Sequence, residues 1–120
     1  MKESPLREKA KKFAIGIVRM YKFLHHEKKE FVMSKQVLRS GTSIGANLSE
    51  AYYAQSSSDF IHKMSIALKE AAETDYWLDL LVSTDYITEQ QYGIMHNACE
   101  ELIKLLTASL KTAKKNAGMK

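Results

Sequence analysis

The sequence predicts an all-α protein, an antiparallel up-down-up-down four-helix bundle, on the strength of three observations. Apolar residues recur at helical spacing through four segments, at about residues 5–26, 31–53, 59–83 and 89–115. The chain holds one proline and five glycines among 120 residues, a composition that favours helices over sheets. Short polar links join the segments and make consecutive helices antiparallel neighbours. A single domain, residues 1–120, is expected at this length.

The first helix, residues 5–26, begins at Ser4-Pro5, because serine is a good N-cap and proline suits the first helical position. Its apolar face recurs at Leu6, Ala10, Phe13, Ile17 and Leu24. The opposite face is almost purely cationic. A charged outer face is the default for an amphipathic helix, but a single sign of charge goes beyond that default.

The second helix, residues 31–53, carries a row of small residues, Gly41, Gly45 and Ser49, stacked on one face. Each glycine costs about 1 kcal/mol against alanine in a helix interior. Close contact with another helix is the expected compensation. The alternative is a loop that divides this segment into two short helices. The broad apolar face also includes Phe31, Val37, Leu38, Ile44, Leu48 and Tyr52.

The third helix, residues 59–83, has two apolar sides. Asp75 lies inside the first of them, where a carboxylate needs a partner, and Arg39 is one candidate. A helix with two apolar faces is either central to a bundle or shared between subunits. Each helix of a four-helix domain needs only one core face, which favours a subunit interface. The second strip consists of Ile66, Trp77 and Leu80, bordered by Glu70 and Glu73.

The fourth helix, residues 89–115, begins with a specific pattern. Thr88 and Gln91 have the spacing of a capping box, in which each side chain bonds the other residue's backbone amide. Gly118 is expected to mark the end of this helix. For the third helix, a serine of the turn at residues 55–58 is expected to serve as the N-terminal cap.

Charge is distributed unevenly along the chain, although the formal net charge is only +4. Residues 1–39 carry 11 Lys and Arg against 4 Glu, while residues 40–110 carry 3 against 10 acidic residues. Such a chain is suited to bind an anionic polymer with its basic region or another copy of itself through its acidic one. A solvated surface without a partner is the alternative. The candidate nucleic-acid-binding residues are Lys11, Lys12, Arg19, Lys22, Lys28, Lys29 and Lys35.

Catalytic and metal-binding patterns are not found. His25 and His26 diverge on a helix, and His96, Cys99 and Glu100 are a weak metal motif because Cys99 falls on the core face. The serines lack a nucleophile elbow, and residues 41–45 lack the spacing and the lysine of a phosphate loop. We therefore expect no enzyme activity, no cofactor and no metal. A single cysteine fits a reducing cytoplasm, and no apolar run is long enough for a membrane span.

Two blocks of the sequence carry a family resemblance that extends over nearly the whole chain. They are SKQVLRSGTSIGANLSEA at residues 34–51 and QSSSDFIHKMSIALKEAAETDYWL at residues 55–78. The chain resembles bacterial four-helix-bundle proteins related to those encoded by intervening sequences in 23S ribosomal RNA genes. That family is also similar to the accessory proteins of diversity-generating retroelements, which are basic pentameric barrels that bind nucleic acid and a reverse transcriptase.

The resemblance implies a left-handed antiparallel bundle assembled as a ring-like homopentamer. It implies no established activity. The residues of the shared blocks have the character of packing, ion-pair or interface residues rather than of a catalytic set. They are Arg39, Ser43, Asn47, Glu50, Glu70 and Glu73.

Two functional hypotheses follow. The first is a non-enzymatic oligomeric bundle that binds structured RNA or DNA through phosphate contacts, with little sequence specificity, because no base-reading motif is present. The second is a protein-interaction scaffold without nucleic-acid binding, whose partner is a reverse transcriptase or another polypeptide. Its basis is the apolar strip around Trp77 together with the acidic middle of the chain.

Overall fold

Four α-helices make up the fold, which the computed structural model describes for residues 4–118. Helix α1 spans Pro5–His26, α2 Met33–Tyr52, α3 Ser57–Ser83 and α4 Glu89–Asn116. No strand occurs between residues 4 and 118. The predicted all-helical, four-helix fold class is confirmed. Over the same residues, no helix combines the length and the apolar character that a membrane crossing requires.

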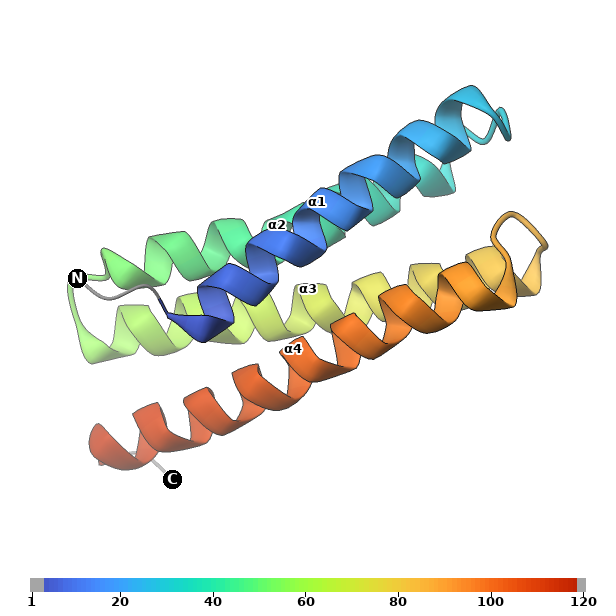
Figure 1. Ribbon diagram of the computed structural model, residues 1–120. Helices are drawn as coiled ribbons and strands as arrows, with labels where there is room; N and C mark the ends of the chain where they lie inside the picture. Colours follow the sequence, from blue (N-terminus) through green and yellow to red (C-terminus); the bar gives the residue numbers. More distant parts are fainter. Residues whose placement is uncertain (1–3, 119–120) are drawn as a thin grey trace.

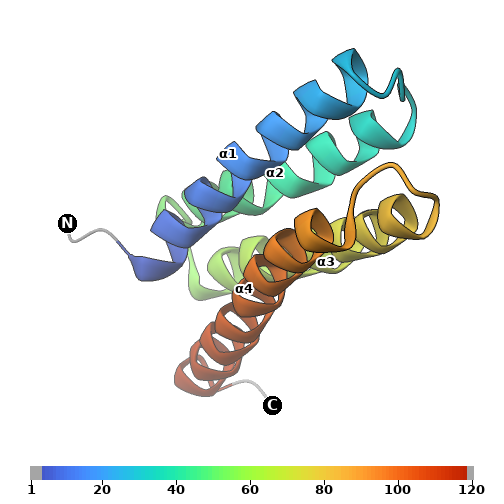
Figure 2. The same ribbon diagram turned by 45° about the vertical axis from the view of Figure 1, so that its right-hand side comes forward.

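Consecutive helices run in opposite directions (Figure 1). α1 and α2 form one hairpin, α3 and α4 form a second, and α2 packs along α3 to join them. The turned view separates the two hairpins and shows the ends of α1 and α4 diverging (Figure 2). α1 meets α4 near its middle, where a Cβ added at Gly16 would lie 3.3 Å from the Met95 side chain. The result is an elongated molecule of 48 × 23 × 22 Å.

Three of the four helices begin with a cap from the side chain of the N-cap residue itself. Ser4 Oγ accepts from the Arg7 amide, and Ser56 Oγ accepts from the Asp59 amide at 3.1 Å. At α4 the Gln91 amide donates to Thr88 Oγ1 at 3.1 Å, while the Thr88 amide donates to Gln91 Oε1 at 2.8 Å. This is the capping box that the sequence predicted. Because Ser56 is the cap, α3 begins at Ser57, two residues earlier than expected.

Helix α2 begins later in the chain than predicted. Glu30 is buried, with 8 % of its surface exposed. Its carboxylate accepts hydrogen bonds from the Ser34 amide at 2.7 Å and from the Val32 amide at 3.2 Å. The carboxylate therefore satisfies amides at the start of α2, and the helix begins at Met33 rather than near residue 31. Phe31, expected on the core face, lies in the connection and is exposed.

The core lies along the inner faces of the four helices. Among its fully buried side chains are Ile17, Leu24, Ile44, Leu48, Leu78, Leu81, Leu102 and Leu106.

The small-residue row lies inside a continuous helix, so the alternative of a dividing loop is wrong. Gly41 is the close contact: a Cβ there would lie 2.7 Å from Ile17 of α1. Gly45 is different, because the nearest atom to an added Cβ is 3.8 Å away, an ordinary contact with Ala10. Ser49 is exposed. Only the first member of the row is therefore required for helix packing within the chain.

Candidate functional site

The predicted cationic residues are all exposed on the structure. Within residues 4–118, no carboxylate lies within ion-pair distance of any of these seven side chains. By contrast, Lys9, on the side of α1 that faces α4, pairs with Glu101 at 3.4 Å. The exposed set comprises Lys11, Lys12, Arg19, Lys22, Lys28, Lys29 and Lys35.

These cations form one surface, here called the basic ridge, along α1 and the loop that follows it. From Lys11 to Lys22 the ridge is three helical turns long, about 16 Å at 1.5 Å per residue. Lys28 and Lys29 extend it beyond the end of α1, with Lys28 Nζ 5.8 Å from the centre of the Phe23 ring. Lys35, on the first turn of α2, follows this loop in the chain and is counted with the ridge. Because these charges have no internal partner, the ridge is able to neutralise a chain of anions.

Arg7 is a further cation near the ridge that the sequence argument did not include. It lies on α1 one turn before Lys11, and its guanidinium carbon is 4.3 Å from the centre of the Tyr52 ring on α2. This cation–π contact holds an otherwise flexible side chain in place. The i, i+4 spacing of Arg7 and Lys11 was visible in the sequence, but the aromatic ring that orients Arg7 comes from another helix.

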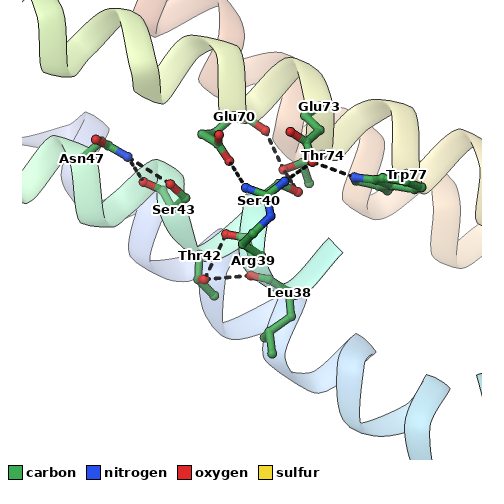
Figure 3. Close-up of polar contacts among 10 residues, drawn as sticks. All are labelled: Leu38, Arg39, Ser40, Thr42, Ser43, Asn47, Glu70, Glu73, Thr74 and Trp77. Atoms are coloured by element: carbon green, nitrogen blue, oxygen red, sulfur yellow. Dashed lines mark hydrogen bonds and ion pairs between the residues drawn. The ribbon is translucent and has the colours of Figure 1, made fainter. Parts of the chain in front are cut away.

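A second polar cluster lies on the opposite side of α2, where it packs on α3 (Figure 3). Arg39 Nη1 donates to Glu70 at 3.1 Å, and its Nη2 donates to Glu73. Glu73 also accepts from the Trp77 indole at 2.9 Å. Below them, the buried hydroxyls of Ser40 and Thr74 lie 2.9 Å apart. The cluster therefore ties α2 to α3 through paired charges.

The Arg39 cluster is partly solvated, and Arg39, Glu70 and Glu73 form the ion pairs that their residue types suggested. The side chain of Arg39 is 51 % exposed, against 17 % for Glu70 and 36 % for Glu73. Asn47 donates to the Ser43 carbonyl of its own helix rather than across an interface. One guanidinium, that of Arg39, binds both carboxylates, so the arrangement favours a structural role over acid–base chemistry.

Glu50, the last of the expected polar partners, lies at the exposed end of α2. It accepts from Lys63 of α3 at 2.7 Å. This pair and the Arg39 cluster connect the same two helices at separate levels.

The second apolar strip of α3 is partly covered within the chain itself. Ile66, Trp77 and Leu80 are each half-buried, and the Trp77 ring packs against the core. The more exposed aromatic on this helix is Tyr76, at 58 %. The strip as predicted is therefore narrower than a full second apolar face, and its use by another subunit stays a prediction.

Asp75 pairs with His96 of α4, and the suggested partner Arg39 is wrong. Asp75 Oδ1 lies 2.7 Å from His96 Nδ1, and Glu100 Oε1 lies 2.8 Å from His96 Nε2. Only the imidazolium has a proton for both acceptors. The hydrogen bond that His96 donates to Asp75 is the main reason that the pKa of His96 is raised above its ordinary value.

Cys99, one turn after His96 on α4, has an unreactive thiol. Cys99 is fully buried and its thiol donates to the Ala71 carbonyl at 3.2 Å. Burial raises its pKa to about 12, so the nucleophilic thiolate is scarce at neutral pH. In residues 4–118 no group of three metal-ligating side chains is assembled.

Comparison with known proteins finds one family. The family described as 23S rRNA-intervening sequence protein matches residues 2–108. A solved structure with TM-score 0.88 and 58 % identity covers 88 % of this chain and 98 % of its own. It is the crystal structure of a protein of unknown function from the S23 ribosomal protein family, from Bacteroides thetaiotaomicron VPI-5482. No curated protein matches the chain.

Proposed function

The chain belongs to the 23S rRNA-intervening sequence protein family, and we propose that it is a non-enzymatic oligomeric bundle that binds structured RNA or DNA. Binding takes place on the basic ridge through phosphate contacts, with little sequence specificity. The observation that carries the proposal is the exposure of the ridge cations without a carboxylate partner among the described residues. Charges already paired inside a protein contribute little to an outside ligand, whereas unpaired ones release counterions from a polyanion.

A charge-reversal experiment tests this proposal. Lys12→Glu, Arg19→Glu and Lys22→Glu are combined in one variant, and affinity for a short RNA hairpin is measured by fluorescence anisotropy. Loss of binding is expected, because three attractive contacts become repulsive. The matched control is Lys69→Glu, Lys104→Glu and Lys111→Glu, which changes the net charge equally at exposed positions away from the ridge. Equal affinity of the two variants contradicts a localised interface.

Oligomerisation is the second part of the proposal. It rests on the half-exposed Trp77 and Leu80 of α3 and on the exposed Tyr76 beside them. Multi-angle light scattering at micromolar concentration is expected to give a mass several times that of one chain, with a pentamer as the expectation from the family resemblance. A monomer at that concentration contradicts this part while leaving RNA binding open to its own test.

The second candidate function is a protein-interaction scaffold, and the same exposed aromatic residues of α3 favour it. In that case the purified protein retains a polypeptide partner and no nucleic acid. The absorbance ratio at 260 and 280 nm of the protein purified from its host separates the two. A nucleic-acid spectrum that nuclease treatment abolishes supports the first candidate, and a protein spectrum with a co-purified polypeptide supports the second.

A further inference from the structure

A groove runs between α1 and α2 on the side of the molecule that carries the basic ridge. Its volume is about 250 Å³. Arg7 and Lys11 of α1 form one wall, and Thr42, Gly45, Ala46 and Ser49 of α2 form the floor and the other wall. Both rows follow helical spacing, so the groove extends along about two turns, roughly 10 Å.

The charges that line this groove are of one sign. Arg7 and Lys11 lie one turn apart, which places them roughly 6 Å from each other at the Cβ atoms. Arg7 is held by the Tyr52 ring, and no carboxylate lines the groove. A neighbouring depression at the end of α2 differs in this respect, because Glu50 and Asp59 line it and Lys63 is bound to Glu50. The charges that line the groove between α1 and α2 therefore favour an anion.

The floor of the groove is open because its residues are small. Gly45 is not needed for packing within the chain, since an added Cβ would meet only ordinary contacts. A glycine in a helix interior costs about 1 kcal/mol against alanine, and nothing inside the subunit accounts for that cost. Ala46 and Ser49 are exposed. Together they leave space for a ligand to approach the α2 backbone closely.

We propose that this groove seats a phosphodiester of a bound nucleic-acid strand. Arg7 and Lys11 neutralise the phosphate, and the Ser49 hydroxyl donates a hydrogen bond to it. The groove adjoins the ridge at Lys11, so a phosphate fixed there sets how the strand lies along Arg19 and Lys22. The inference rests on the proposed function and gives it a defined anchoring point, which a uniformly charged ridge lacks.

The test fills the groove without changing any charge. Ala46→Leu and Ser49→Leu each place a bulky side chain at an exposed position, and Ala72→Leu on the exposed face of α3 is the control. Circular dichroism and thermal melting verify that each variant is folded. We expect both groove variants to bind a short RNA hairpin about tenfold more weakly, a change of 1.4 kcal/mol, with the control unchanged. Affinity equal to that of the wild type in both groove variants overturns the groove proposal, even where reversal of the ridge charges abolishes binding.

A second measurement separates failure of the groove from failure of the proposed function. Pyrophosphate is titrated into the full-length protein, and the backbone amide NMR signals of Gly45 and Ser49 are followed. Saturable shifts that Arg7→Gln and Lys11→Gln together remove support an anion site, whether or not the RNA hairpin binds. Absence of shifts at these amides overturns it. A change of oligomeric mass in Ser49→Leu, without any pyrophosphate effect, also overturns it, because the groove is then an interface between copies.

Discussion

At the scale of single residues, two glycines of the same helix are expected to behave in opposite ways. A Cβ at Gly41 would lie 2.7 Å from the fully buried Ile17, so Gly41→Ala forces a side chain or a helix to move. We expect a loss of about 1–3 kcal/mol in the free energy of unfolding, as in other overpacked cores. Gly45→Ala meets no such obstacle, and a gain of up to about 1 kcal/mol is expected from helix propensity.

Urea denaturation of the two variants checks this contrast. It is a sensitive comparison because both substitutions add the same methyl group to the same helix, four residues apart. Equal stabilities for Gly41→Ala and Gly45→Ala would show that α1 and α2 do not approach each other as closely as the Gly41 contact indicates.

His96 gives the protein a pH-dependent stability. The hydrogen bond to Asp75, and then the neighbouring charges of Asp75 and Glu100, raise the pKa of His96 above its ordinary value of 6.5. The imidazolium is therefore more stable in the folded chain than in the unfolded one. Its contribution is fully present below pH 6.5 and is lost as pH rises through the higher pKa of the folded state.

The measurement is the free energy of unfolding between pH 5.5 and 9 for the wild type and for His96→Gln. Tyr92 stacks on the His96 ring, and the charge of Asp79 acts on Tyr92, so neither residue is substituted in this comparison. The difference between the two proteins is expected to shrink as pH rises. Curves that run parallel across this range contradict the stabilisation of charged His96 by Asp75 and Glu100.

At the scale of the helices, the start of α2 depends on one buried carboxylate. Glu30 accepts hydrogen bonds from the amides of Val32 and Ser34, and its charge lies near the positive end of the helix dipole. Glu30→Ala removes both acceptors, and we expect a loss of about 1–2 kcal/mol in stability. Glu27→Ala, at an exposed position in the same loop, is the control. Thermal melting that shifts equally in both variants contradicts a specific capping role.

The number, length and inner faces of the helices were predictable because periodicity depends only on local sequence. Val37, Ile44 and Leu48 repeat at helical spacing, and all three are buried. The beginning of α2 was not predictable in this way, since Glu30 caps the helix from four residues before Ser34 rather than from the usual N-cap position. The cap of α4 follows the common Thr88–Gln91 pattern and was found directly.

Contacts between helices depend on their axial register, which periodicity does not contain. Asp75 lies on a core face in either case, but whether it meets Arg39 of α2 or His96 of α4 is decided by how far the helices are shifted along one another. The same limitation concealed the role of Arg7, whose orientation comes from Tyr52 on the neighbouring helix. The ridge cations of α1 needed no register, because the exposure of Lys11, Lys12, Arg19 and Lys22 follows from their position on that helix alone.

At the scale of the whole molecule, the fold separates charge that the net value of +4 conceals. The basic ridge and the groove share one side of α1, whereas Glu70, Glu73 and Asp75 on α3 are each engaged by a cationic partner or by His96. The ridge cations have no ion-pair partner in residues 4–118, so they are suited to attract a polyanion at long range, and the strength of that attraction depends on salt.

The salt dependence of RNA binding by the wild-type protein tests the proposed function most directly. Each phosphate neutralised by the ridge contributes roughly −0.7 to −0.9 to the slope of log affinity against log salt concentration. Four or more contacts along α1 and its loop therefore predict a slope of roughly −3 or steeper for a short RNA hairpin. A slope near zero, or no binding even at low salt, would contradict nucleic-acid recognition through this ridge.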